Sequence, residues 1–287
     1  MKSHRITSRS FVLAIALAAV LAATGIRTAS AQEAEAPTRQ HWSFAGPFGT
    51  YDQAQLQRGF KIYREVCSNC HSLKLIAFRN LADPGGPGFT ELQAATVAES
   101  YQITDGPNDQ GQMFQRPGRI ADYFPSPFPN EQAARAALGG ALPPDMSDLA
   151  KGRGYEWGFP WFILDAFTMY QEDGPDYIHA LLNGYSDPPS GFTMPPGAQY
   201  NKYFPSHAIG MPKPLSDGQV EYTDGTPATV DQYARDVAAF LMWAAEPTLD
   251  ARKRLGFQVM IFLIVFTGLL YFTKKKVWHD VLHQSDL

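Results

Sequence analysis

The chain of 287 residues contains only two cysteines, Cys67 and Cys70, which stand three positions apart in the stretch CSNCH. So few cysteines exclude a disulfide framework and any zinc site built from four thiolates. A single disulfide at this spacing would restrain almost none of the chain, and a thioredoxin-type redox pair needs a strand–helix–strand context that this segment lacks. The two cysteines are therefore expected to serve a cofactor.

Acidic residues are missing from residues 1–31, and every charge is missing from Leu255–Thr273. Residues 1–31 contain basic residues, then an apolar stretch that is short for a membrane span, and end in the sequence ASA. This order is typical of a cleaved secretory signal. The segment Leu255–Thr273 is long enough to cross a bilayer as a helix and lies between basic clusters. The sequence therefore predicts four parts: a signal peptide at 1–31, an exported domain at 32–251, a transmembrane anchor at 252–276 and a short cytoplasmic tail at 277–287.

Basic residues are scarce in the exported domain. Residues 32–251 hold 14 basic and 26 acidic residues, which gives a net charge of −12. Such a domain repels nucleic acid and attracts basic partners.

Internal repeats are absent, and hydrophobic periodicity predicts a mainly α-helical domain with long Pro/Gly-rich loops. Residues 185–228 contain eight prolines and are too long for a plain connection, and their aromatic residues favour a segment that covers something over a disordered one. The expected helices are an amphipathic one ending at Cys67, TELQAATVAE capped by Thr90, NEQAARAALGG capped by Asn130, GPDYIHALLNG from Pro175 to Gly184, and TVDQYARDVAAFLMWAAEP from Thr229 to Pro247.

The order Cys-x-x-Cys-His is the attachment pattern of c-type haem. One turn of chain presents both thiols to the two vinyl groups of the porphyrin, where they form thioethers, and the adjacent histidine gives its imidazole to the iron. We therefore expect one covalent haem c on Cys67 and Cys70, with His71 as an iron ligand.

The other face of the iron needs a sixth ligand or stays open. A methionine thioether gives a closed electron-transfer site, whereas an open face favours gas or peroxide chemistry. Met194 and Met211 both lie in the proline-rich segment, where prolines hold a loop rigid, and composition does not choose between them. Met113 and Met146 also remain, and His207 is a weaker rival in the same segment.

Several longer stretches resemble the cytochrome c1 family, whose members are haem subunits of ubiquinol–cytochrome c reductase (bc1) complexes. They are RGFKIYREVCSNCHSL, GGALPPDMSDLAKGR, GPDYIHALLNGY, YNKYFPSHAIGMPKPL and DGTPATVDQYARDVAAFLMWAAEP. The resemblance covers about residues 40–280 and, with the signal peptide, indicates a bacterial member. Residues 154–173 depart from it, because they are longer and more apolar than the mitochondrial pattern.

The resemblance also implies which residues surround the haem. The family's A-I-G-M-x-x-P block makes Met211 the second iron ligand. Its PPD motif places Pro143 and Pro144 against the haem, and an arginine after that motif, here Arg153, pairs with a propionate. Four further residues fall at positions that line the pocket in relatives: Tyr63, Tyr177, Leu181 and Phe204.

A function in electron transfer follows from the same resemblance. The haem domain is expected on the periplasmic side of the inner membrane, held in the lipid by its anchor, in a reductase with cytochrome b and the Rieske iron–sulfur protein. It takes electrons from the Rieske protein and passes them to a soluble cytochrome c, so alone it is an electron carrier without catalytic residues. Another membrane-anchored monohaem c-type shuttle, serving an oxidase or photosynthetic centre, and a thiol–disulfide enzyme are the alternatives.

Overall fold

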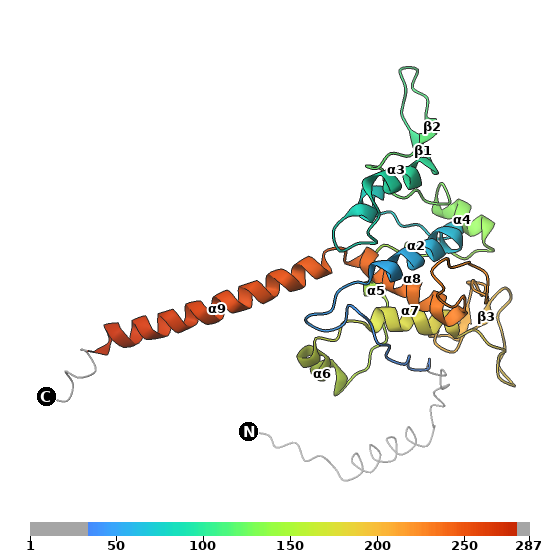
Figure 1. Ribbon diagram of the computed structural model, residues 1–287. Helices are drawn as coiled ribbons and strands as arrows, with labels where there is room; N and C mark the ends of the chain where they lie inside the picture. The colour runs from blue at the N-terminus through green and yellow to red at the C-terminus, as the bar shows by residue number, and fades with distance from the viewer. Residues whose placement is uncertain (1–33, 280–287) are drawn as a thin grey trace, which may run out of the picture. The chain divides into compact units, whose positions relative to one another are not determined.

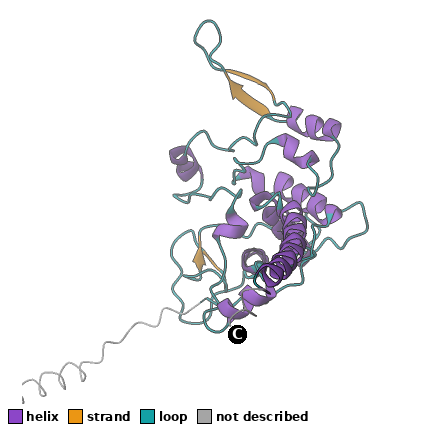
Figure 2. Ribbon diagram, turned by 90° about the vertical axis from the view of Figure 1, so that its left-hand side faces the viewer, coloured by secondary structure: helices purple, strands orange, loops and turns teal. Residues whose placement is uncertain are grey.

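The computed structural model describes residues 34–279, so the expected signal peptide and most of the expected tail lie outside the described residues. The described part is mainly helical, as the sequence predicts (Figures 1 and 2). Its helices are α2 (Gln53–Glu65), α3 (Glu91–Glu99), α4 (Glu131–Ala137), α5 (Leu149–Gly152), α6 (Trp161–Thr168), α7 (Asp173–Asn183), α8 (Val230–Ala245) and α9 (Leu249–Val277), with short 3-10 turns η1 (Cys67–Asn69) and η2 (Phe78–Ala82).

Two small antiparallel sheets interrupt the helices of the described part. Strands β1 (Gln102–Asp105) and β2 (Phe114–Pro117) form a hairpin that extends beyond α3 in Figure 1. Strands β3 (Gln199–Tyr200) and β4 (Ala208–Ile209) pair inside the proline-rich segment. The second sheet folds that segment back on itself, which restrains a stretch with no helix of its own.

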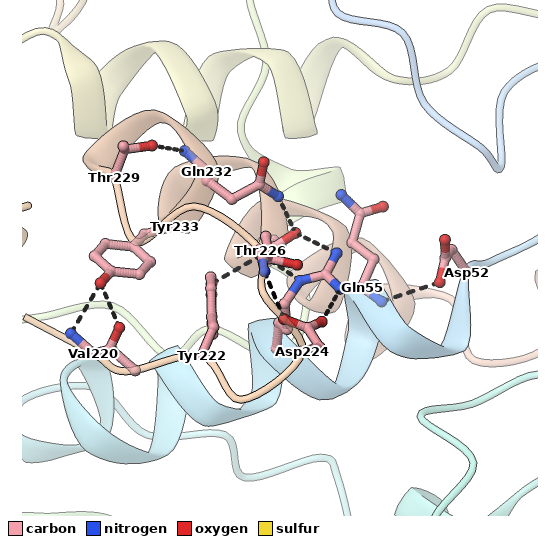
Figure 3. Close-up of polar contacts among 11 residues, drawn as sticks. Asp52, Gln55, Val220, Tyr222, Asp224, Thr226, Thr229, Gln232 and Tyr233 are labelled. Carbon is pink, nitrogen blue, oxygen red and sulfur yellow. Dashed lines mark hydrogen bonds and ion pairs between the residues drawn. The ribbon is translucent and has the colours of Figure 1, made fainter. Parts of the chain in front are cut away.

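The helix starts follow the capping residues that the sequence offers. The Thr90 hydroxyl accepts the N–H of Gln93 at 3.2 Å, and the Gln93 side chain accepts the N–H of Thr90 in return. Thr229 accepts from Gln232 in the same way at the start of α8, as Figure 3 shows. Helix α4 begins directly after Asn130. The helices expected at these positions are confirmed.

The core forms where α2 and α7 pack on α8. A Cβ atom at Gly59 would lie 2.1 Å from the backbone oxygen of Asp236, so only glycine allows α2 to approach α8 this closely. Beside this contact, the ring of Phe240 lies 5.7 Å from Phe60 and 5.8 Å from Tyr63, all three buried. The residues of α2 that precede Cys67 are thus held in place by the hydrophobic core.

A buried carboxylate joins α2, α8 and the loop before α8. Asp236 is fully buried and accepts hydrogen bonds from Arg58, Tyr222 and Gln232, each at 2.9 Å. Arg58 also reaches Asp224 at 2.8 Å. Figure 3 shows the loop residues Tyr222 and Asp224 lying over α2. A charge buried with a hydrogen-bonded partner of opposite sign avoids the large cost of burying it alone.

Helix α9 contains the charge-free run and is the membrane anchor helix expected from the sequence. Its most apolar window has a mean hydropathy of 2.2, and none of that window is buried. The start of α9 packs on the domain: Leu249 is buried, the ammonium of Lys253 donates to the backbone oxygens of Phe44 and Gly49, and the ring centroid of Phe257 lies 5.6 Å from that of Phe48. The apolar remainder has the length and composition to cross a bilayer.

Candidate functional site

The CSNCH stretch forms one tight turn directly after α2. The N–H groups of Cys70 and His71 both donate to the backbone oxygen of Cys67, at 3.1 and 2.9 Å. The turn keeps the two thiols close and leaves both cysteines free. Burial, with a smaller contribution from Cys70, raises the pKa of Cys67 to about 12. Thiol–disulfide enzymes work through a thiolate of lowered pKa, so this environment does not favour that chemistry.

The imidazole of His71 is buried and held in one orientation. Its Nδ1 atom lies 2.8 Å from the carbonyl oxygen of Pro144, and the hydroxyl of Tyr63 donates to the His71 backbone oxygen at 3.4 Å. Because a carbonyl oxygen only accepts, Nδ1 carries the proton and Nε2 keeps its lone pair. Burial lowers the pKa of His71, which favours the neutral ring. A neutral imidazole whose second nitrogen is held by a carbonyl is the usual form of a metal-ligating histidine.

The aspartate of the PPD motif holds this motif against the segment that follows CSNCH. Asp145 accepts hydrogen bonds from the hydroxyl of Ser72 at 2.6 Å and from the N–H of Lys74 at 3.0 Å. Burial pushes the pKa of Asp145 upward, but hydrogen bonds from Ser147, Ser72 and Lys74 leave it below its ordinary value. The ionised carboxylate therefore fixes the two segments side by side, and this brings Pro144 to His71.

A mostly apolar cavity of about 540 Å³ opens beside this turn. This volume is in the range of small-molecule and cofactor sites. Distant parts of the chain provide the lining: Cys70 and His71 after α2, Leu138, Ala141, Leu142, Pro143, Pro144, Leu149 and Arg153 between α4 and α6, Tyr177, Ile178 and Leu181 on α7, and Gly197, Phe204, Ile209, Gly210, Met211 and Pro212 in the proline-rich segment.

Most of the site residues expected from the sequence meet in this lining. They are Cys70, His71, Met211, Arg153, Pro143, Pro144, Tyr177, Leu181 and Phe204. Cys67 and Tyr63 lie beside the lining and not in it: Cys67 packs against the hydrophobic core, and Tyr63 is buried within it. Tyr63 therefore supports the turn from behind, through its hydroxyl contact with the backbone of His71.

Among the methionines that the structure describes, Met211 is the one in the cavity lining. The hydroxyl of Tyr185 donates to the Met211 backbone oxygen at 3.1 Å and fixes that part of the loop. Met194 lies outside the lining, Met113 is exposed, and Met146 is buried in the core. Of the methionines that composition left open as the sixth iron ligand, Met211 is therefore the one whose position in the structure suits that role.

The proline-rich segment covers one side of the cavity, as its aromatic residues predict. Gly197, Phe204 and Met211 face the cavity from it. His207 does not: it is buried within the segment, stacked on Tyr200 with ring centroids 5.4 Å apart. Its position makes His207 part of the support for the loop.

A positive charge borders the cavity without a carboxylate partner. Arg153 is the basic residue of the lining, and no ion pair links its side chain to an acid within residues 34–279. Burial raises the pKa of Tyr177, and the nearby guanidinium of Arg153 acts in the opposite direction. Two thiols, a free imidazole nitrogen, a thioether, an apolar wall and an unpaired cation are the groups that a haem c with its propionates requires.

Sequence reasoning missed much of the apolar wall. Ile178 could have been found, because it accompanies Tyr177 and Leu181 at helical spacing on α7. Leu138 and Ile209 carry no such signal, since they lie in loops or at strand ends where periodicity does not indicate a face.

Known proteins match this chain along most of its length. The model of the Cytochrome C1 family matches residues 42–281. A protein of Bradyrhizobium diazoefficiens named Cytochrome b/c1 is 62% identical over 94% of the chain, which spans only 40% of that protein. Cytochrome c1 of Blastochloris viridis is 52% identical over 94% of the chain and 96% of its own length. The mitochondrial "Cytochrome c1, heme protein" of Kluyveromyces lactis is 46% identical over 84% of the chain and 75% of its own length. With its turn of two cysteines and a histidine beside an apolar cavity, the chain belongs to the cytochrome c1 family.

Proposed function

We propose that the chain is the haem subunit of a ubiquinol–cytochrome c reductase, and that it carries electrons from the Rieske iron–sulfur protein to a soluble cytochrome c. The observation that carries this proposal is the meeting of Cys70, His71 and Met211 in one cavity, with Cys67 at its edge. Membership of the cytochrome c1 family supports the same reading.

In this proposal Cys67 and Cys70 hold one haem c through thioethers, and His71 Nε2 and the Met211 sulfur are the iron ligands. The haem, when bound, supplies a one-electron iron couple. The chain's own residues orient the ligands: the Pro144 carbonyl fixes the His71 ring, and Tyr185 fixes the backbone of Met211.

The remaining lining residues set the surroundings of the haem. Pro143, Pro144, Tyr177, Leu181 and Phe204 exclude water from its faces, and Arg153 balances a propionate charge. Exclusion of water and a fixed charge are the means by which a protein tunes a haem potential.

Partners and location form part of the proposal. Helix α9 anchors the haem domain at the periplasmic side of the inner membrane, beside cytochrome b and the Rieske protein. The relative named for both cytochrome b and c1 supports the first of these partners. The net charge of −12 on residues 32–251 steers a basic cytochrome c toward the domain. Steering of this kind raises the association rate more than the affinity.

The test is purification of the tagged full-length chain from bacterial membranes in mild detergent. We expect cytochrome b and a Rieske protein to co-purify, and added quinol to reduce the haem and then an added basic cytochrome c. The second-order rate of cytochrome c reduction should fall as ionic strength rises. A red chain that purifies without either partner and is not reduced by quinol would instead support the alternative, a membrane-anchored c-type shuttle for another oxidase or photosynthetic centre.

A further inference from the structure

Helix α6 exposes its apolar face to solvent. Phe159, Phe162 and Phe167 are 79%, 64% and 83% exposed, and Phe48 is 73% exposed. Outside α9, these are the phenylalanines of the described residues with more than 60% of their surface exposed. We refer to these four side chains as the phenylalanine patch. The ring centroids of Phe159 and Phe162 lie 6.5 Å apart, and exposed apolar side chains of this kind mark surfaces that bind another protein or a membrane.

The orientation of α6 is imposed by the residues on its inner side. Asp165 receives two hydrogen bonds from Arg39, at 2.9 and 2.7 Å. The guanidinium carbon of Arg39 also lies 4.2 Å from the ring centroid of Tyr170, 4.9 Å from that of Trp157 and 4.8 Å from that of Trp161. Charge-assisted, bidentate and cation–π contacts together hold the charged side of α6 against the protein. The apolar side is therefore left outside, the reverse of an ordinary surface helix.

Phe48, one member of the phenylalanine patch, packs on the start of the anchor helix. The segment that begins at Arg39 continues to Phe48, whose ring centroid is 5.6 Å from that of Phe257, the third residue of the charge-free run. Lys253 in the first turn of α9 donates to backbone oxygens of the same segment. After α6, Glu172 is buried, which raises its pKa, and nearby Lys253 acts in the opposite direction. The segment 39–49 and Glu172, which follows α6, are thus near the start of α9, and Figure 1 shows α6 on the side of the domain from which α9 leaves.

We propose that the phenylalanine patch lies in the headgroup region of the same bilayer that α9 crosses, so that the haem domain is attached to the membrane at two places. This inference rests on the anchor helix of the proposed function. Helices with one apolar face lie flat in the membrane interface, and aromatic residues favour that depth. Each phenylalanine moved from water into an apolar phase strengthens this second attachment.

Lipid fits this surface better than a protein partner does. A protein interface surrounds its apolar centre with a rim of polar groups. In residues 154–173, Asp165 accepts from Arg39, and Asp173 accepts from the indole N–H of Trp157. Glu172 is buried, which leaves Glu156 as the exposed charge of this stretch. Residues 154–173 contain no lysine or arginine, so insertion would depend on apolar area and not on anionic lipid.

The experiment places the photoreactive residue p-benzoylphenylalanine at Phe162 or Phe167 of the full-length chain in native membranes. The same residue at Phe257 in α9 is the positive control for lipid contact. At Leu92 in α3, which is 78% exposed, it is the control for exposure alone. An unchanged haem spectrum shows that each variant has folded. After irradiation, gel electrophoresis and intact mass identify what each position has captured.

Phospholipid adducts at Phe162, Phe167 and Phe257, with none at Leu92, are the expected result. Lipid at Phe257 together with a polypeptide adduct, or no adduct, at Phe162 and Phe167 would overturn the inference and leave the anchor intact. Lipid adducts at Leu92 as well would show that capture is unselective, and this also overturns it. Absence of lipid adducts at Phe257 would contradict the anchor helix itself.

Discussion

Two side chains from unrelated parts of the chain face the same cavity, and each is positioned by a neighbour outside the proposed coordination. His71 follows a tight turn and is oriented by the carbonyl of Pro144. Met211 follows the β3–β4 pair and has its backbone fixed by Tyr185. A ligand that stays in place when the iron changes charge lowers the cost of electron transfer, because little has to reorganise.

Replacement of the methionine tests its role at this scale. Met211→Leu should leave haem covalently attached, because the thioethers come from Cys67 and Cys70. It should lower the midpoint potential sharply, because the soft thioether sulfur of Met211 would favour ferrous iron. A redox titration measures this, with Met194→Leu as the matched control. An unchanged potential in Met211→Leu, with the drop in Met194→Leu instead, would remove Met211 from the site.

The charge at the cavity edge gives a second prediction. Arg153→Gln should lower the midpoint potential modestly and reduce thermal stability, because a haem propionate loses its compensating charge. Arg79→Gln removes an exposed arginine outside the cavity and should change neither quantity. Potential and melting temperature both equal to those of the unaltered protein would mean that Arg153 is an ordinary surface residue.

Helices α2 and α8 form much of the core, and α2 leads directly into the turn that contains the cysteines. They touch at Gly59 and are joined through the Arg58–Asp236 pair. Because Asp236 is fully buried, its carboxylate depends on that partner. Any loosening between the two helices would therefore move the end of α2 and the haem-binding turn with it.

Arg58→Met should lower the free energy of unfolding by about 3 kcal/mol or more, because it leaves a buried carboxylate without its cation. Arg64→Met, on the exposed side of the same helix, should cost less than about 1 kcal/mol. Thermal unfolding followed by the haem absorption band compares the two variants. Equal melting temperatures would show that Tyr222 and Gln232 alone satisfy Asp236.

The helices and the cysteine turn could be predicted because their signals are local. Capping residues such as Thr90 and Thr229 and the C-x-x-C-H spacing act within a few residues of themselves. The orientation of α6 could not, because it depends on Arg39, which lies 126 positions from Asp165. From the sequence alone, an apolar run such as residues 154–173 gives no indication of which side faces the protein.

Over the whole molecule, the membrane anchor and the haem domain share a short border. The chain turns after α8, but the core does not end there: Leu249 is buried, and Arg252 donates to Glu246 at 2.5 Å. The expected border after residue 251 lies inside α9 (Leu249–Val277), and residues on both sides of it contact the domain.

Two truncated chains test how much the first residues of α9 contribute to the haem domain. A stop after Arg254 keeps Leu249, Arg252 and Lys253 and should release a soluble, red, low-spin protein into the periplasm. A stop after Glu246 should give the same spectrum but a lower melting temperature, since it removes a buried leucine worth about 1.5–3 kcal/mol. Fractionation, absorption spectra and melting curves provide the comparison. A colourless or high-spin product from the longer form would mean that the anchor contributes to the haem fold.

The central claim is that Cys67 and Cys70 hold one haem c whose iron is ligated by His71 and Met211. The most direct measurement is a pyridine haemochrome spectrum of the purified full-length chain, taken before and after extraction with acidified acetone. We predict a c-type spectrum, one haem per chain, and no loss of colour on extraction, because two thioether bonds retain the haem. A chain that is colourless, or whose haem passes into the acetone, would contradict the account.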